Sequence, residues 1–132
     1  MAENSSKDLL GPEIRKFLAK NIDSVAMLEV LLFLFKRKEA AWTAEQITHE
    51  LRSSLPAVQL RLTRLIAFGL VRGAGSAFEF DASSDDIART VEKLHSLHQQ
   101  YPMRVIEQIY SRKSHAQILA DAFRIKPGDE DG

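Results

Sequence analysis

The sequence contains no cysteine. This absence excludes disulfides, thiolate metal ligands and a cysteine nucleophile, and it suits a reducing compartment. An excess of one charge is also lacking, because 18 Lys and Arg residues balance 18 Asp and Glu residues. Domains that bind nucleic acid usually carry a basic excess. Any nucleic-acid site in this chain must therefore be a local patch.

Long apolar runs are missing as well. The longest uninterrupted one is Val30–Phe35, far below the roughly 20 residues that a membrane-spanning helix needs. The amino end lacks the basic start, apolar stretch and cleavage site of a signal peptide. We therefore expect a cytoplasmic protein with no membrane partner.

The motifs of common enzyme classes are also absent. The sequence has no glycine-rich phosphate loop, no nucleophile elbow and no evident pair of catalytic carboxylates. His95 and His98 are three residues apart, a spacing that places two imidazoles on one side of a helix, but no accompanying carboxylate or cysteine is evident. A metal-sensing role is thus the weakest interpretation, and we expect no enzyme activity, no cofactor and no metal site.

The composition is that of an ordinary globular protein. The 132 residues include 45% hydrophobic and 27% charged residues, which suits one compact unit with a real core. We divide the chain into a flexible tail (1–8), a domain of helices and a hairpin (9–82), a helical extension (83–126) and a second tail (127–132).

Two helices are expected before residue 40. Gly11 and a proline open the first, which runs to about Lys20. Asp23 or Ser24 can cap the second, which is apolar on most sides up to Phe35. Such a helix must be covered by other elements, so it is the best candidate for the centre of the core.

Two short helices joined by a tight turn are predicted next. Thr43 and Gln46 have the spacing of a capping box, which starts the first of them. Residues 53–56 end it and start another helix. The inward side of that helix is predicted to carry Val58, Leu62, Leu65 and Ile66.

A β-hairpin follows these helices. Gly69 ends the second helix, residues 70–72 and 77–80 are predicted strands, and residues 73–76 are the predicted turn.

More helices are expected after the hairpin. Serine and aspartate at 83–86 signal the start of a helix to about Tyr101, and Pro102 then kinks or breaks it. A last helix is predicted from about Ser114 to Ile125.

Two stretches of the chain carry a family resemblance. Residues 43–47 and 58–72 resemble the winged helix-turn-helix regulators of the multiple-antibiotic-resistance type, above all in the Arg-Leu-x-x-x-Gly-Leu-Val run that begins at Arg64. A longer pattern, from Asp23 to Arg124, is similar to a family of small bacterial winged-helix proteins. The resemblance implies a mainly α fold with a winged helix-turn-helix over residues 24–81.

The same resemblance implies a transcriptional regulator that binds double-stranded DNA. In such regulators the second helix of the motif enters the major groove and the wing contacts the backbone. The matching candidates are Gln59, Arg61, Thr63 and Arg64 on the helix, Arg72 in the wing and Arg52 on the preceding helix. Lys36–Lys38 could also contact phosphates, but their basic charge also suits the end of a helix.

The helices after the hairpin are expected to form a homodimer, as the helices outside the motif do in the related regulators. The candidate contacts are Leu94, Leu97, Tyr101, Ile106, Ile109, Tyr110 and Phe123. The alternative is that these helices cover the apolar second helix of the same chain.

An alternative function is a winged-helix adaptor that binds a protein partner without sequence-specific recognition of DNA. The outward side of the second motif helix is predicted to carry Pro56, Leu60, Thr63, Arg64 and Ala67. Leu60 offers no hydrogen bond to a base edge. A protein partner held through this face is therefore the second hypothesis.

Overall fold

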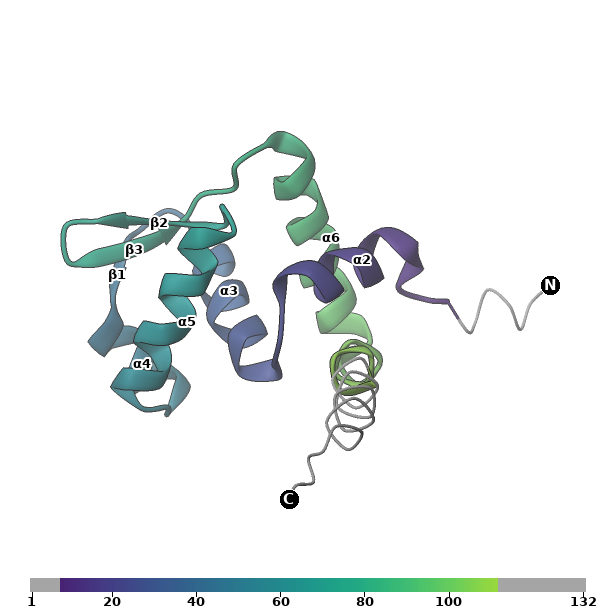
Figure 1. Ribbon diagram of the computed structural model, residues 1–132, viewed down its shortest axis with the longest axis horizontal. Coiled ribbons are helices and arrows are strands. Elements are labelled where there is room, and N and C mark those ends of the chain that lie inside the picture. The colour runs from purple at the N-terminus through teal and green to yellow at the C-terminus, as the bar shows by residue number, and fades with distance from the viewer. Residues whose placement is uncertain (1–7, 112–132) are drawn as a thin grey trace, which may run out of the picture.

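The computed structural model describes residues 8–111, which are mainly helical with a small antiparallel sheet (Figure 1). This confirms the expected fold class at that level. The elements are α2 (Gly11–Asn21), α3 (Val25–Lys36), β1 (Trp42–Thr43), α4 (Ala44–Leu51), α5 (Leu55–Ala67), β2 (Val71–Ala74), β3 (Ala77–Phe80) and α6 (Asp85–Gln100). Residues 102–111 are helical too.

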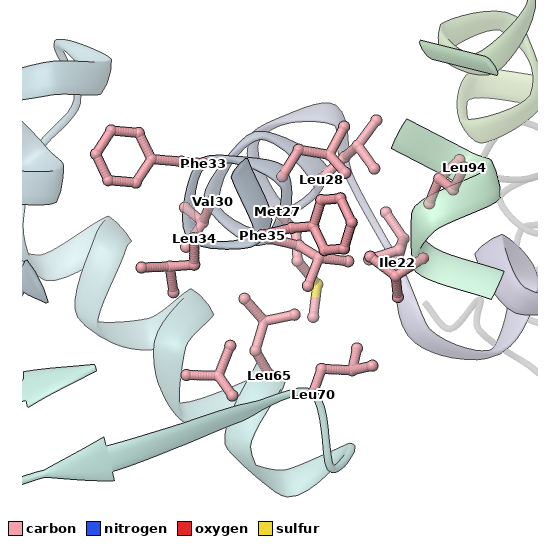
Figure 2. Close-up of a cluster of buried hydrophobic side chains, with 14 of the residues drawn as sticks. Ile22, Met27, Leu28, Val30, Phe33, Leu34, Phe35, Leu65, Leu70 and Leu94 are labelled. Carbon is pink, nitrogen blue, oxygen red and sulfur yellow. The ribbon is translucent and has the colours of Figure 1, made fainter. Parts of the chain in front are cut away.

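Helix α3 is the centre of the core, as predicted. Eight of its twelve residues are buried, and the exposed residues Glu29 and Lys36 share one stripe of the helix. Figure 2 shows these side chains meeting Leu65 and Leu70 on one side and Leu94 of α6 on another. The helix begins where Ser24 Oγ accepts a hydrogen bond of 3.1 Å from the amide of Met27.

Other elements cover α3 from two directions. In Figure 1 the sheet, α4 and α5 lie on one side of α3, and α2 and α6 lie on the other. Phe35 meets Phe80 of β3 edge-on at 5.2 Å between ring centroids, and Phe33 meets Trp42 of β1 at 5.1 Å. Such edge-to-face pairs stabilise by about 0.5–1.5 kcal/mol beyond area burial. They attach the sheet to α3.

A short connection joins α4 to α5, and each of the two helices begins with a side-chain cap. The predicted capping box is present, since the Gln46 amide donates to Thr43 Oγ1 (3.1 Å) and the Thr43 amide donates to Gln46 Oε1 (2.9 Å). Arg52 ends α4 in a left-handed conformation, with φ of 54°. Ser54 then caps α5. The two helices are therefore separated only by residues 52–54.

The sheet differs from the prediction in two respects. Gly73 and Ala74 belong to β2 and pair with Phe78 and Ala77, so the turn is shorter than the expected 73–76. Strand β1 was not predicted, because two residues are too few to show alternation. It pairs with β3 and makes the order β1-β3-β2.

The segment after the hairpin packs onto the same core. The helix breaks at Tyr101 as expected, and the next helix buries Val105 and Ile109. Thr90 Oγ1 donates to Glu13 Oε2 (2.9 Å), which links α6 to α2. The buried residues from Leu10 to Ile109 form one cluster. The helix predicted at 114–125, the tail 127–132 and residues 1–7 of the predicted tail 1–8 lie outside the described residues.

We expect Gly69→Ala to destabilise the protein more than Gly75→Ala. Both glycines have positive φ, 77° and 66°, so each alanine pays about 1–2 kcal/mol for the left-handed conformation. At Gly69 a Cβ would also lie 3.0 Å from Ser83 Oγ. Ser83 cannot simply retreat, since its amide donates to the Gly69 carbonyl at 2.8 Å. Urea unfolding measures the free energy of unfolding of both variants. Equal decreases would show that the close approach of Ser83 to Gly69 has no effect on stability.

Candidate functional site

The outward side of α5 is exposed as predicted. Val58, Leu62 and Leu65 are buried in the core. The exposed positions are Pro56, Gln59, Leu60, Thr63, Arg64 and Ala67. Leu60 has 52% of its surface accessible, so a large aliphatic side chain stands in the middle of this surface.

Ile66 is a correction to the prediction, because 41% of its surface is exposed. It follows the buried Leu65 by one residue, and the 100° rotation per residue turns it out of the core. Its Cδ1 lies 3.9 Å from the position that a Cβ on Gly73 would occupy, which places Ile66 beside the hairpin. Phe68, just after α5, is 42% exposed. The α5 face is thus more apolar than expected.

Two of the predicted DNA contacts share one stripe of α5. Gln59 and Thr63 are both exposed and one turn apart, and Ile66 continues the stripe toward the hairpin. The Thr63 hydroxyl donates to the Gln59 carbonyl at 3.0 Å. Its proton is therefore already used within the helix.

Arg64 and Arg61 lie on another side of α5, toward the connection between α2 and α3. Arg64 Nη1 is hydrogen-bonded and ion-paired to Asp23 Oδ2, with both side chains about half exposed (48% and 53%). Arg61 is half-buried. The role of Asp23 as a partner was not predicted, because nothing in a sequence links positions 41 residues apart.

Arg72 on β2 is neutralised by its neighbours in the sheet. It is hydrogen-bonded to Glu79, its cross-strand partner in β3, and its Nε lies 3.9 Å from Asp81 Oδ2. The hydrogen bond that Arg72 donates to Glu79, together with the charges of Glu79 and then Asp81, raises the pKa of Arg72. The hairpin therefore adds little net positive charge beside α5.

Arg52 stands apart from the other predicted contacts. It is exposed at the end of α4 and lines a different hollow, next to His49 and Glu50. The six predicted DNA contacts are consequently divided among four places, and they do not make one continuous basic surface.

A groove of about 580 Å³ runs beside α5. It lies between α5, the end of α2, the start of α3 and Ile109. Its lining consists of Ala19, Lys20, Asn21, Ile22, Asp23, Ser24, Leu60, Arg61, Arg64, Phe68 and Ile109. Apolar and basic side chains thus meet in the same groove.

The basic run at the end of α3 packs against aromatic rings. The Arg37 guanidinium lies 3.9 Å from the Phe33 ring centroid and Lys38 Nζ lies 4.5 Å from that of Phe35. Arg37 Nη1 also donates to the Phe33 carbonyl at 3.3 Å. These contacts give the run a local role in covering and completing the end of α3.

His95 packs beside the same aromatic end of α3. Its ring centroid is 5.3 Å from that of Phe35, and its buried Nε2 has no hydrogen-bond partner. Burial, followed by the charges of Lys36, His98 and Lys38, lowers the pKa of His95. Among residues 8–111 there is no group of three or more potential ligands that could hold a metal ion.

The predicted dimer contacts are divided between core and surface. Leu94 is completely buried and Ile109 is 3% exposed, so neither can reach a second copy unless the protomer opens. Leu97 and Ile106 are half-buried. Tyr101 and Tyr110 are exposed, at 40% and 57%, and Phe123 lies outside the described residues. Among the predicted contacts that the structure describes, the two tyrosines are the exposed ones.

We expect His95 to make the protein less stable in mild acid. Because its pKa is lowered on folding, the unfolded chain takes up a proton first as the pH falls through about 6.5. The free energy of unfolding therefore decreases from that pH down to the folded-state pKa. Urea unfolding of the wild type and His95→Gln at several pH values isolates this contribution. A variant with the same pH dependence as the wild type would contradict it.

We expect the double variant Tyr101→Asp/Tyr110→Asp to be monomeric if the segment forms the predicted homodimer. Each change places a charge on an exposed apolar surface, so it costs little in the isolated protomer but opposes its burial between two copies. Sedimentation velocity measures the mass. A wild type that is already monomeric, or a variant that stays dimeric, would refute this placement of the interface.

Within residues 8–111 no helix is both long and apolar enough to cross a membrane. In comparisons with known proteins, no family model, no curated protein and no solved structure matches the chain.

Proposed function

We propose that residues 24–81 form a winged helix-turn-helix module that acts as a protein-docking adaptor, with the exposed face of α5 as its contact surface. The order of α3, α4 and α5, followed at once by the β2–β3 hairpin, supports the winged-helix assignment. The paired strand β1 is compatible with it, since it adds a short third strand to the hairpin.

The observation that carries the docking function is the chemistry of the α5 surface. Leu60 and Phe68 expose 52% and 42% of their surface on the groove side of α5. Covering the exposed half of such a side chain contributes about 1 kcal/mol of binding free energy. Exposed apolar side chains next to one another are typical of the centre of a protein interface.

The arginines of the same region favour this interpretation. Arg64 and Arg72 are each paired with carboxylates of the same chain. An exposed ion pair is worth only about 0–1 kcal/mol, so DNA could break it. The carboxylates would nevertheless stay close to the phosphates and oppose binding. These pairs reduce what the surface gains from phosphates, and the exposed apolar side chains beside them fit a protein partner best.

A DNA-binding transcriptional regulator is the second candidate. It is favoured by Gln59 and Thr63, which are exposed one turn apart on the side of α5 next to the hairpin. Glutamine can read an adenine edge in the major groove. This candidate uses the hairpin side of α5, whereas the adaptor uses the side with Leu60 and the groove.

We expect a photoreactive phenylalanine analogue placed at Leu60 to form crosslinks to protein in living cells. Leu60 lies at the proposed contact, so the probe should be within reach of the partner. The matched control is the same analogue at Glu92, an exposed position on α6, which should form none. Crosslinks to DNA from Leu60 or from Thr63, without protein adducts, would refute the adaptor and support the regulator.

A further inference from the structure

We propose that the groove beside α5 binds an acidic segment of a partner protein that carries apolar anchor side chains. This inference rests on the proposed docking function and specifies the chemistry of the partner.

The groove is apolar at its base and basic at its edges. Ile22 and Ile109 are almost completely buried beneath it, and Leu60 and Phe68 are about half exposed at its side. An incoming leucine or phenylalanine would therefore meet apolar surface from below and from α5. A polar ligand without apolar anchors would leave the exposed side chains of Leu60 and Phe68 uncovered.

The charge of the groove lining determines which kind of apolar segment binds there. The lining contains three cationic side chains, Lys20, Arg61 and Arg64, and a single carboxylate, Asp23. The end of α2 and the start of α3 also meet here, but their partial charges are opposite and about equal, so they nearly cancel. The net positive charge comes from the side chains, and it favours a partner with carboxylates.

The ion pair between Arg64 and Asp23 shows how such a partner can bind. It joins α5 to the connection between α2 and α3 at the edge of the groove. Both side chains are about half exposed, so the pair is weak and exchangeable. A carboxylate of the partner can take the place of Asp23 on the guanidinium.

The exposure of the groove favours a protein segment over a small molecule. Lys20, Asp23, Leu60, Arg64 and Phe68 are all exposed. Small-molecule sites usually bury 70–90% of their ligand, which a groove with such open walls would not do. A segment that continues along α5 can cover Leu60 and Phe68 together.

The test uses the full chain and synthetic peptides of about three helical turns. The acidic probe has two leucines one turn apart with glutamates around them. A matched peptide has glutamine in place of every glutamate, and another has lysine. We expect the acidic peptide to bind at least about tenfold more tightly than the glutamine peptide, and the lysine peptide not to bind. Isothermal titration calorimetry measures the three affinities.

Substitutions in the groove test separately the attraction of acidic residues and the contact with apolar anchors. Asp23→Asn removes the competing carboxylate and should tighten binding roughly two- to fivefold. Arg64→Gln and Leu60→Gln should each weaken it. The matched controls are Asp86→Asn and Arg89→Gln, which alter an exposed ion pair on α6, and Met103→Gln, which alters an exposed apolar residue outside the groove lining. These controls should leave the affinity unchanged.

Other outcomes would overturn the inference. Equal binding of all three peptides, with sensitivity to Leu60→Gln, would mean that α5 docks proteins without selecting acidic ones, so the adaptor would stand and this inference would fail. No peptide binding together with no protein crosslink from Leu60 would reject both. If neutralising Asp129, Glu130 and Asp131 in the full chain tightened binding more than tenfold, the acidic end of the same chain would be the occupant. Displacement of the peptide by duplex DNA, without an effect of Leu60→Gln, would assign the groove to nucleic acid.

Discussion

The arrangement of this protein depends on the burial of α3 on most of its sides. Eight of its twelve side chains are buried, and each contributes about 1.5–3 kcal/mol when it is fully removed from water. A helix cap contributes about 1 kcal/mol. The need to cover α3 therefore dominates local preferences, and it places the sheet with α4 and α5 on one side and α2 with α6 on the other (Figure 1).

This constraint also determines what α5 can offer to a partner. Val58, Leu62 and Leu65 are committed to the core, so the remaining sides of α5 face solvent or its neighbours. One side continues to the hairpin through Ile66, and the other forms the groove with the ends of α2 and α3. The proposed docking function uses the second side, where apolar surface and positive charge occur together.

Local signals made most of the architecture predictable from the sequence. The caps at Ser24 and Thr43 and the apolar spacing of α3 and α5 are encoded by residues close together in the chain. The chemistry of the surface was less predictable, because it depends on distant pairs. The partner of Arg64 is Asp23, which lies 41 residues earlier in the chain. Strand β1 exists through its pairing with β3 and has no local signal of its own.

We propose that the α5 surface recognises protein and not DNA. The most direct measurement is the affinity of the full chain for random duplex DNA between about 50 and 200 mM salt, because phosphate contacts weaken binding steeply over this range. Because Arg64 and Arg72 are paired with carboxylates and Leu60 is exposed, we predict no measurable binding, or binding that barely changes with salt. Tight binding at low salt that falls about a thousandfold across the range, with a shallower dependence in Arg64→Ala, would contradict it.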